Sequence, residues 1–292
     1  MPSVMLIGPV AKDIIIKNDY RYKSIGGAVF YQSHVLSSLK INCKALITIS
    51  KNDEELLHSF PEDVELIPVY VNETINFHNI YPDEDPNHRI QKACVPDNPI
   101  ESVSDRIKSS DIILLGPLCP YDIPLKTIKE LSKLNKPIYL GAQGYLRHLI
   151  NNEVILKPWQ SYKNYLKYID ILFIDENESA IILGEKHPLY ETAEILTSFG
   201  PREVIITCGS RGSLIYSKEL NKSFKVPAFK PEKIEDPTGL GDTYMAAYAS
   251  YKFKTEDPVK CGRFAAAAAS IKLQNKGPFK GNKKLIEARC KF

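Results

Sequence analysis

The stretch Asp236-Pro237-Thr238-Gly239-Leu240-Gly241-Asp242 decides the fold, and it leads into residues 243–251, where small and aromatic side chains recur every three or four positions. That spacing predicts a helix. Gly239 and Gly241 then lie just before the helix or at its first turn, where residues without side chains let backbone N–H groups face a ligand. The positive end of a helix dipole favours an anion, so this turn predicts a phosphate site.

The carboxylate of Asp242 needs an explanation, because a negative charge beside a bound phosphate is repelled. General-base catalysis supplies one, since a carboxylate next to a transferring phosphoryl group can accept the proton of the attacking hydroxyl. The alternative is structural: Asp is common in the first turn of a helix, and Gly-x-Gly is common in turns. The seven residues by themselves leave both interpretations open.

Four segments, taken in order, resemble the ribokinase-like (PfkB) carbohydrate kinases. The family's last motif reads Asp-Thr-x-Gly-x-Gly-Asp, and this chain departs from it at Pro237. The other three segments are Gly26-Gly27 before an apolar run of helical period, Asp175-Glu176-Asn177-Glu178, and residues 205–212. The resemblance implies a three-layer α/β/α fold with a mostly parallel central sheet and a small β-sheet lid, in a single kinase domain over residues 1–292.

The alternation of strands and helices along the chain agrees with a layered α/β domain. Strands are predicted at 4–8, 45–49, 112–116, 138–140, 171–174 and 204–208, and helices at 27–39, 100–109, 125–134, 178–183, 190–198, 242–253 and 258–273. Residues 14–24 and 64–95 instead alternate polar and β-forming residues, which is typical of strands exposed on one face. A turn at 82–87 would make part of the second segment a hairpin. By resemblance, these two segments are the lid.

The resemblance also implies the chemistry, which is ATP-dependent phosphorylation of a hydroxyl on a small sugar or polyol. Asp242 would be the general base, and the turn made by Gly239, Leu240, Gly241 and Asp242 would be the anion hole. Glu178 and Asp175 are candidate ligands of Mg²⁺, directly or through water, because magnesium prefers oxygen ligands. The family usually has Asn at position 175, and capping of a helix is the alternative role for this Asp.

Two further sets of residues follow from the resemblance. Asp236 and Thr238 match positions that help to bind a monovalent cation such as K⁺, with stabilisation of the turn by their side chains as the alternative. The candidates on the nucleotide side are Thr207, Gly209, Gly212 and Gly277. The segment 209–212 could equally be an ordinary hairpin turn.

The candidate acceptor-binding residues are Asp13, Gly26, Gly27, Asn79, Arg89, Gln143 and Arg147. A carboxylate such as Asp13 can take two hydrogen bonds from a polyol, although a solvated loop charge is the alternative. The lid and residues 142–147 resemble a branch that includes archaeal and plant inositol kinases, so myo-inositol is one candidate acceptor. Gly141 departs from that branch, which often has Asp there, and Tyr31 departs from ribokinase, which has Asn.

Two other functions remain open: a kinase for a nucleoside or another sugar, and a non-catalytic regulator that binds a sugar or nucleotide. The balance of 38 Lys and Arg against 35 Asp and Glu gives a net charge of only +3, so a nucleic-acid partner is not expected. The sequence predicts neither a signal peptide nor a membrane span, and we expect a cytoplasmic protein. Open edges of the lid strands predict a homodimer, with a monomer as the alternative.

Overall fold

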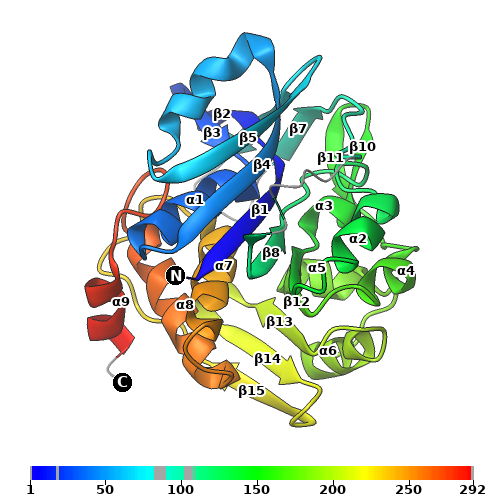
Figure 1. The fold of residues 1–292 in the computed structure, drawn as a ribbon, viewed down its shortest axis with the longest axis vertical. Helices are drawn as coiled ribbons and strands as arrows, with labels where there is room; N and C mark the ends of the chain where they lie inside the picture. The colour runs from blue at the N-terminus through cyan, green and yellow to red at the C-terminus, as the bar shows by residue number, and fades with distance from the viewer. Residues whose placement is uncertain (1, 18–19, 82–89, 102–106, 108, 291–292) are drawn as a thin grey trace.

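The computed structural model describes residues 2–17, 20–81, 90–101, 107 and 109–290. Over these residues the strands form two sheets, a main sheet of nine strands and a small sheet of six. The strand order is β15-β14-β13-β12-β9-β8-β1-β4-β5 in the main sheet and β10-β11-β7-β6-β2-β3 in the small sheet. Figure 1 shows the main sheet crossing the molecule from β15 at the bottom to β4 and β5 at the top.

The strands of the main sheet from β13 to β5 are parallel. Strand β14 pairs antiparallel with β13, and β15 pairs antiparallel with β14. Its strands are β1 (Ser3–Pro9), β4 (Asn42–Ser50), β5 (Val64–Val71), β8 (Ile112–Leu115), β9 (Ile138–Gly141), β12 (Ile171–Asp175), β13 (Glu203–Thr207), β14 (Ser213–Ser217) and β15 (Lys222–Val226). All six strands predicted for the layered domain are therefore confirmed, within two or three residues at their ends. They are short apolar runs because the strands of a parallel sheet are buried on both faces.

Helices cover both faces of this sheet (Figure 1). They are α1 (Ala28–Ser38), α2 (Leu125–Ser132), α3 (Gln143–Leu146), α4 (Tyr162–Leu166), α5 (Glu176–Ile181), α6 (Leu189–Thr197), α7 (Leu240–Lys252), α8 (Pro258–Leu273) and α9 (Lys283–Cys290). Strand β1 shows how the layers form, because successive side chains point to opposite faces. Val4 and Leu6 belong to the apolar cluster with α1, α7 and α8, whereas Met5 and Ile7 belong to the cluster with α2 and α6. The three-layer α/β/α architecture is thus confirmed.

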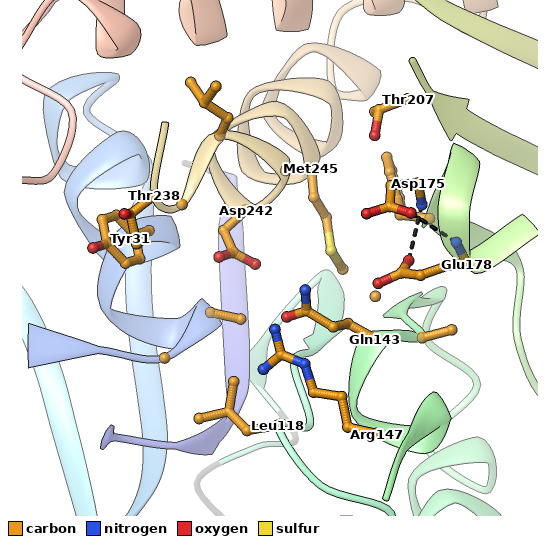
Figure 2. A pocket seen from close by; sticks show the side chains of 18 of the residues that line it. Tyr31, Leu118, Gln143, Arg147, Asp175, Glu178, Thr207, Thr238, Asp242 and Met245 are labelled. Atoms are coloured by element: carbon orange, nitrogen blue, oxygen red, sulfur yellow. Dashed lines mark hydrogen bonds between the residues drawn. The ribbon is translucent and has the colours of Figure 1, made fainter. Parts of the chain in front are cut away.

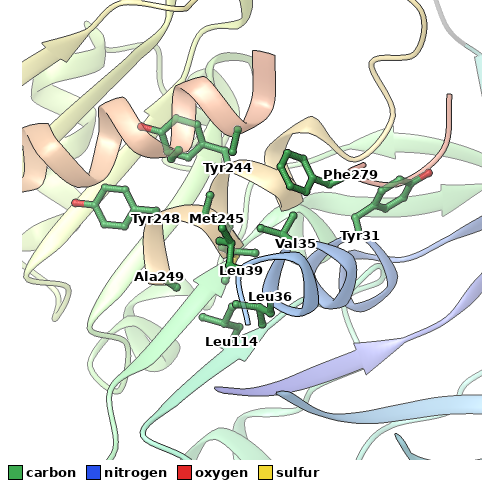
Figure 3. Packing of buried hydrophobic residues seen from close by; sticks show 14 of the residues in the cluster. Tyr31, Val35, Leu36, Leu39, Leu114, Tyr244, Met245, Tyr248, Ala249 and Phe279 are labelled. Atoms are coloured by element: carbon green, nitrogen blue, oxygen red, sulfur yellow. The ribbon is translucent and has the colours of Figure 1, made fainter. Parts of the chain in front are cut away.

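Helices α7 and α8 pack against each other, and buried alanines on both helices allow their backbones to come close. Ala246, Ala247 and Ala249 on α7 and residues 265–268 on α8 are buried in the cluster shown in part in Figure 3. Helix α8 starts at a well-made cap, in which the Asp257 carboxylate accepts hydrogen bonds from the N–H groups of Val259 and Lys260. The alanine-rich run therefore serves helix–helix packing and fixes α7, the helix that follows the glycine turn.

The small sheet contains β2 (Ala11–Lys17), β3 (Tyr20–Gly26), β6 (Ile75–Tyr81), β7 (Ile90–Cys94), β10 (Arg147–Ile150) and β11 (Glu153–Leu156). The predicted hairpin is present as the antiparallel pair of β6 and β7, while the turn predicted at 82–87 lies outside the described residues. The helix predicted at 100–109 also falls largely outside them. Strands β10 and β11, which were not predicted, also belong to this sheet.

One boundary of the predicted lid differs from the structure. Residues 64–71, placed in the second lid segment, form β5, which pairs with β4 along the edge of the main sheet. An edge strand is half exposed, so its residues alternate in the same way as those of a small covering sheet. The first segment is also longer than predicted, because β2 begins at Ala11 and β3 ends at Gly26.

Within the described part of the chain, no helix has both the length and the apolar character needed to cross a membrane.

Candidate active site

A cavity of about 300 Å³ lies where the carboxyl ends of β9, β12 and β13 meet the small sheet and the start of α7. Predicted site residues that line it are Asp13, Gly27, Asn79, Gln143, Arg147, Asp175, Glu178, Thr207, Thr238, Gly239, Leu240, Gly241 and Asp242. These side chains come from both ends of the chain and converge on one space (Figure 2). Gly26, Asp236, Gly209, Gly212 and Gly277 are not among its lining residues, and Arg89 lies outside the described residues.

The glycine turn and the helix after it have the predicted arrangement. Gly239 is the N-terminal cap of α7, with a left-handed φ of 74° that glycine adopts without strain. Its carbonyl accepts the N–H of Thr243, while the N–H of Leu240 turns back to the carbonyl of Pro237 at 3.3 Å. A β-carbon on Gly241 would meet no atom within 4 Å, so the backbone there is open to the cavity. The first amides of a helix have no partner within the helix, so those of Gly241 and Asp242 are candidates to bind an anion.

Asp242 projects into the middle of the cavity, across from Arg147 and Gln143 (Figure 2). Burial raises the pKa of its carboxyl to about 6, and the positive charges of Arg147 and Lys272 oppose that rise. A carboxyl with a pKa near 6 is ionised at neutral pH and still basic enough to accept a proton in a reaction.

Asp175 and Glu178 form a reciprocal pair at the start of α5. The Asp175 carboxylate accepts the N–H of Glu178, and the Glu178 carboxylate accepts the N–H of Asp175, both at 2.8 Å. This capping box confirms the structural alternative for Asp175. Burial and the Asp175 charge raise the pKa of Glu178, and burial likewise raises that of Asp175. Two carboxylates that face the cavity and are costly to keep charged suit a cation, and Mg²⁺ is often held by one or two carboxylates and phosphate oxygens.

The side of the cavity that the small sheet forms carries the residues predicted to bind an acceptor. Asp13 is buried against Gly26, where a β-carbon would lie 2.4 Å from the Asp13 carboxylate, so the predicted glycine makes room for this side chain. Asn79 on β6 accepts a hydrogen bond of 2.7 Å from the Gln91 amide on β7. The Arg147 guanidinium lies 5.6 Å from the ring centre of Phe77. Strands of the small sheet therefore place a set of hydrogen-bonding groups around one small volume.

Asp236 lies beneath the turn and is fully engaged by the protein. Its carboxylate accepts the N–H groups of Thr238 at 2.9 Å and of Gly277 at 3.1 Å, which confirms that it stabilises the turn. The Lys272 ammonium, completely buried, lies 3.2 Å from the same carboxylate and donates a 2.7 Å hydrogen bond to the Asp236 carbonyl. The oxygens of Asp236, one of the two residues assigned to a monovalent cation, thus already bind a cation of the chain itself, so they do not fit a bound K⁺.

The residues predicted for the nucleotide side lie in different places. Thr207, at the end of β13, lines the cavity. Gly209 and Gly212 have positive φ angles of 56° and 95° in the tight connection from β13 to β14, where the Cys208 N–H donates to the Gly212 carbonyl. This is the ordinary hairpin turn that was the alternative for this segment. Any contact of Gly209, Gly212 or Gly277 with a nucleotide stays a prediction.

Several residues of this region were not predicted as site residues, among them Tyr31, Met245 and Lys272. Tyr31 and Met245 line the cavity, and Lys272 lies behind the turn. Met245 follows Asp242 by three positions on α7 and therefore faces the same way, a signal that the helical period contained. Lys272 gave no such signal, because a basic residue in the last turn of a helix ordinarily complements the dipole.

Comparison with known proteins agrees with this geometry. The family model described as pfkB family carbohydrate kinase matches residues 69–284, more than half of the chain. A nucleoside kinase of Methanocaldococcus jannaschii is 37% identical over 134 residues, which are 44% of this chain and 43% of that protein. A ribokinase of Arabidopsis thaliana is 29% identical over 195 residues, 64% of this chain and 47% of that protein. The chain thus spans less than half the length of these curated relatives.

Two solved structures share the fold over the whole chain. A pyrophosphate-dependent kinase in the ribokinase family, complexed with a pyrophosphate analog and myo-inositol, has a TM-score of 0.84 at 23% identity and covers 98% of this chain and 99% of that one. Arabidopsis thaliana ribokinase complexed with ribose and ATP has a TM-score of 0.80 at 20% identity and covers 100% of this chain and 99% of that one. At these identities the likeness shows the fold.

Proposed function

Because this chain belongs to the pfkB family of carbohydrate kinases, we propose that it transfers the terminal phosphoryl group of ATP to a hydroxyl of a small sugar or polyol, with myo-inositol as one candidate acceptor. The observation that carries the proposal is the position of Asp242. Its carboxylate shares one cavity with the first turn of α7 on one side and with Asp13, Asn79 and Arg147 on the other. Groups that suit the roles of a base, an anion site and a hydroxyl-binding site therefore surround the same volume.

The reaction would proceed between these groups. The acceptor hydroxyl would give its proton to the Asp242 carboxylate as its oxygen forms the new bond to phosphorus and the bond to the ADP oxygen breaks. The amides of Gly241 and Asp242 would stabilise the charge on the oxygens of the transferring group. Bound Mg²⁺ would neutralise negative charge on the donor phosphates. Asp175 and Glu178 are the residues that would hold it, directly or through water.

Exclusion of water is the second requirement, since water is a competing acceptor. The small sheet covers the acceptor side of the cavity through Phe77, Asn79 and Gln91. We infer that it acts as a lid within a single kinase domain, closing over the acceptor while the main sheet holds the donor. Asn79 and Gln91 are already hydrogen-bonded to each other, which fixes their orientation toward hydroxyl groups.

A nucleoside is the second candidate acceptor. The relative from Methanocaldococcus jannaschii is named a nucleoside kinase, and the acceptor side also contains the apolar side chains of Phe77 and Leu118. A base could pack against such surfaces. Donor choice is open in the same way, because one of the proteins with this fold uses pyrophosphate.

One screen tests these possibilities. Purified protein would be given ATP or pyrophosphate together with myo-inositol, ribose, fructose or a set of nucleosides, and donor consumption would be measured. We expect ATP-dependent turnover with a polyol or sugar. Turnover with nucleosides alone would show that the acceptor is a nucleoside, and turnover with pyrophosphate alone would show that the donor is pyrophosphate. Binding of a sugar with no turnover under any condition would favour the non-catalytic regulator.

The Asp242→Asn variant then tests the base. It keeps the size of the side chain and one acceptor oxygen but cannot take up the proton, so we expect binding of the acceptor to be retained while kcat falls by about 10²–10⁴-fold. Asp97→Asn is the matched control, because Asp97 is an exposed carboxylate outside the cavity. Full turnover by Asp242→Asn would show that the proton goes elsewhere.

A further inference from the structure

The Lys272 ammonium lies directly behind the turn that precedes α7. It is completely buried, and its nitrogen is 2.7 Å from the carbonyl oxygen and 3.2 Å from a carboxylate oxygen of Asp236. We propose that Lys272 takes the place of a free monovalent cation at this position, so that the protein needs no K⁺. The proposal rests on the proposed function where it concerns turnover, and on the folded structure alone where it concerns stability.

Several features of this position call for a positive charge. The segment of Glu235 and Asp236 is tied to the end of α8, because their N–H groups donate to the carbonyl of Leu273 at 2.9 and 3.4 Å. The last turn of a helix carries partial negative charge, which favours a cation. The Asp236 carboxylate adds a full negative charge in the same half-buried volume, and a carbonyl oxygen completes the set. These are the oxygen ligands that a hard monovalent cation would otherwise bind.

Lysine already satisfies this requirement. Although burial would raise the pKa of Asp236, the Lys272 ammonium and the N–H groups of Thr238 and Gly277 lower it, so the carboxylate is ionised. The pair is then neutral as a whole. A K⁺ ion on the same two oxygens would place a second positive charge close to the ammonium in a site with little water, which is costly. Lysine and K⁺ therefore exclude each other here.

Lys272 acts on the reaction through the turn that it supports. Asp236 is three residues before Gly239, the cap of α7, and its carboxylate also binds the N–H of Thr238. The ammonium lies 5.7 Å from the ring centre of Tyr31, which packs against Gly239. Its charge also reaches Asp242 and opposes the rise in the pKa of that carboxyl. Lys272 is thus a positioning residue, because its charge on α8 holds Asp236 and thereby the turn that precedes α7.

The first experiment uses the unaltered protein. Turnover and the midpoint of thermal unfolding would be measured in KCl, NaCl and tetramethylammonium chloride at equal ionic strength. We expect the same rate within about twofold in all three salts and no rise of the unfolding midpoint specific to K⁺. A saturable, K⁺-specific increase in either quantity beyond that range would overturn the proposal. The unfolding data decide the question even if no acceptor is turned over, which separates this test from that of the proposed function.

The second experiment removes the charge. Lys272→Met keeps most of the side-chain volume but leaves Asp236 buried without its cation, and we expect the unfolding midpoint in tetramethylammonium chloride to fall by about 5–10 °C. K⁺ should then bind the vacated oxygens and raise the midpoint of this variant in a saturable way. Lys260→Met is the control on the same helix, since Lys260 is exposed and lies 3.8 Å from Asp257.

The outcomes divide clearly. The proposal is supported if K⁺ specifically stabilises Lys272→Met but stabilises neither the wild type nor Lys260→Met. If the lysine were merely structural, Lys272→Met would lose stability and no salt would restore it. An unchanged midpoint in Lys272→Met, or a loss that K⁺ leaves unaltered, would overturn the proposal. If Lys272→Met does not fold, the double variant with Asp236→Asn, which removes both charges, should fold, and the wild-type salt comparison decides the K⁺ requirement.

Discussion

Gly239 lies so close to the ring of Tyr31 that a β-carbon on the glycine would be 2.3 Å from a ring carbon. Two segments that are far apart in the sequence meet here, since Tyr31 is on α1 and Gly239 caps α7. The left-handed φ of 74° at Gly239 adds a second reason why only glycine fits. The contact fixes the distance between the turn that precedes α7 and helix α1.

Gly239→Ala should therefore damage both stability and activity. The steric overlap with Tyr31 and the strained backbone predict a loss of about 2–4 kcal/mol in the free energy of unfolding, measured by denaturant titration. Gly241→Ala is the matched control, because a β-carbon there meets no atom within 4 Å and alanine favours a helix. We expect Gly241→Ala to unfold no more easily than the wild type but to lose kcat/KM, as its methyl group occupies space for the phosphate. Equal stability of the two variants would contradict this account.

The pH dependence of turnover should follow Asp242. The base must be ionised, and burial raises its pKa to about 6, so kcat/KM should fall about tenfold per pH unit below that value. The measurement is a pH–rate profile of the wild type. An acid limb that stays flat down to pH 5 would mean that another group accepts the proton.

The free energy of unfolding should also depend on the Asp242 carboxyl, but it should fall as pH rises, whereas turnover should increase. The folded pKa of about 6 lies above the ordinary value of 3.8, so the folded state binds more protons in this window and stability falls as pH rises through it. Asp242→Asn carries no charge and should exceed the wild type by about 1–3 kcal/mol at pH 7. The difference should vanish below about pH 4. Unfolding titrations at both pH values check the sign, with Asp97→Asn showing no such crossover.

The Mg²⁺ requirement should depend on Glu178 more than on Asp175. Glu178→Gln keeps an oxygen for the N–H of Asp175 but removes a charge from the cavity, so the Mg²⁺ concentration for half-maximal rate should rise about 10–100-fold. Asp175→Asn keeps the cap, since Asn is an equally good capping residue, and should change that concentration much less. Rates measured against total Mg²⁺ at fixed donor give both values. Identical curves for Glu178→Gln and the wild type would show that Glu178 does not help to hold Mg²⁺.

A buried ion pair away from the cavity should matter for stability alone. Lys252 on α7 lies 2.9 Å from Glu203, whose other oxygen accepts a hydrogen bond of 2.6 Å from the Tyr248 hydroxyl. Lys252→Met would leave a buried carboxylate without its cation and should lower the free energy of unfolding by about 3–5 kcal/mol. We expect kcat to stay unchanged at temperatures where the variant is folded. A loss of turnover in the folded variant would show that the pair also supports the turn.

The edge of the small sheet offers a test of assembly. Strand β3 is the last strand in its order over the described residues, and the side chains of Tyr20 and Tyr22 are 77% and 52% exposed. Pairing of β3 between two copies predicts a homodimer, since an open edge carries unmet hydrogen-bonding groups. Sedimentation of the wild type and of Tyr22→Pro, which removes a strand N–H, would decide it. A wild type that sediments as a monomer contradicts the pairing.

The parts of the fold that could be predicted are those where burial imposes a pattern. Runs such as 112–115 and 171–174 are apolar throughout because both faces of the main sheet are covered. Strand β15 was missed because it is an edge strand with polar residues, and α3 and α4 were missed because helices of four or five residues show no period. Strand β5 was assigned to the wrong sheet, since alternation reveals a half-exposed strand but not its partner.

The candidate site divides in the same way. Glycines and acids near the start of α7 stand out because few other positions need them, whereas Lys272 has an ordinary place in its own helix. The role of Lys272 depends on Asp236, which is 36 residues earlier in the sequence. The two residues meet only because α8 packs against the turn that precedes α7. A contact of this kind leaves no local mark in a single sequence.

Residue 13 lines one side of the cavity and residue 242 lines another. All strands of the main sheet except β1 lie between these two residues in the sequence, and hence in the order of synthesis. A chain still emerging from the ribosome can assemble the sheet, yet it cannot offer an acceptor a complete pocket until α7 has docked. A bound acceptor would then clamp early and late portions of the polypeptide together, so that limited proteolysis in its presence should be slowed at sites throughout the molecule and not merely beside the ligand.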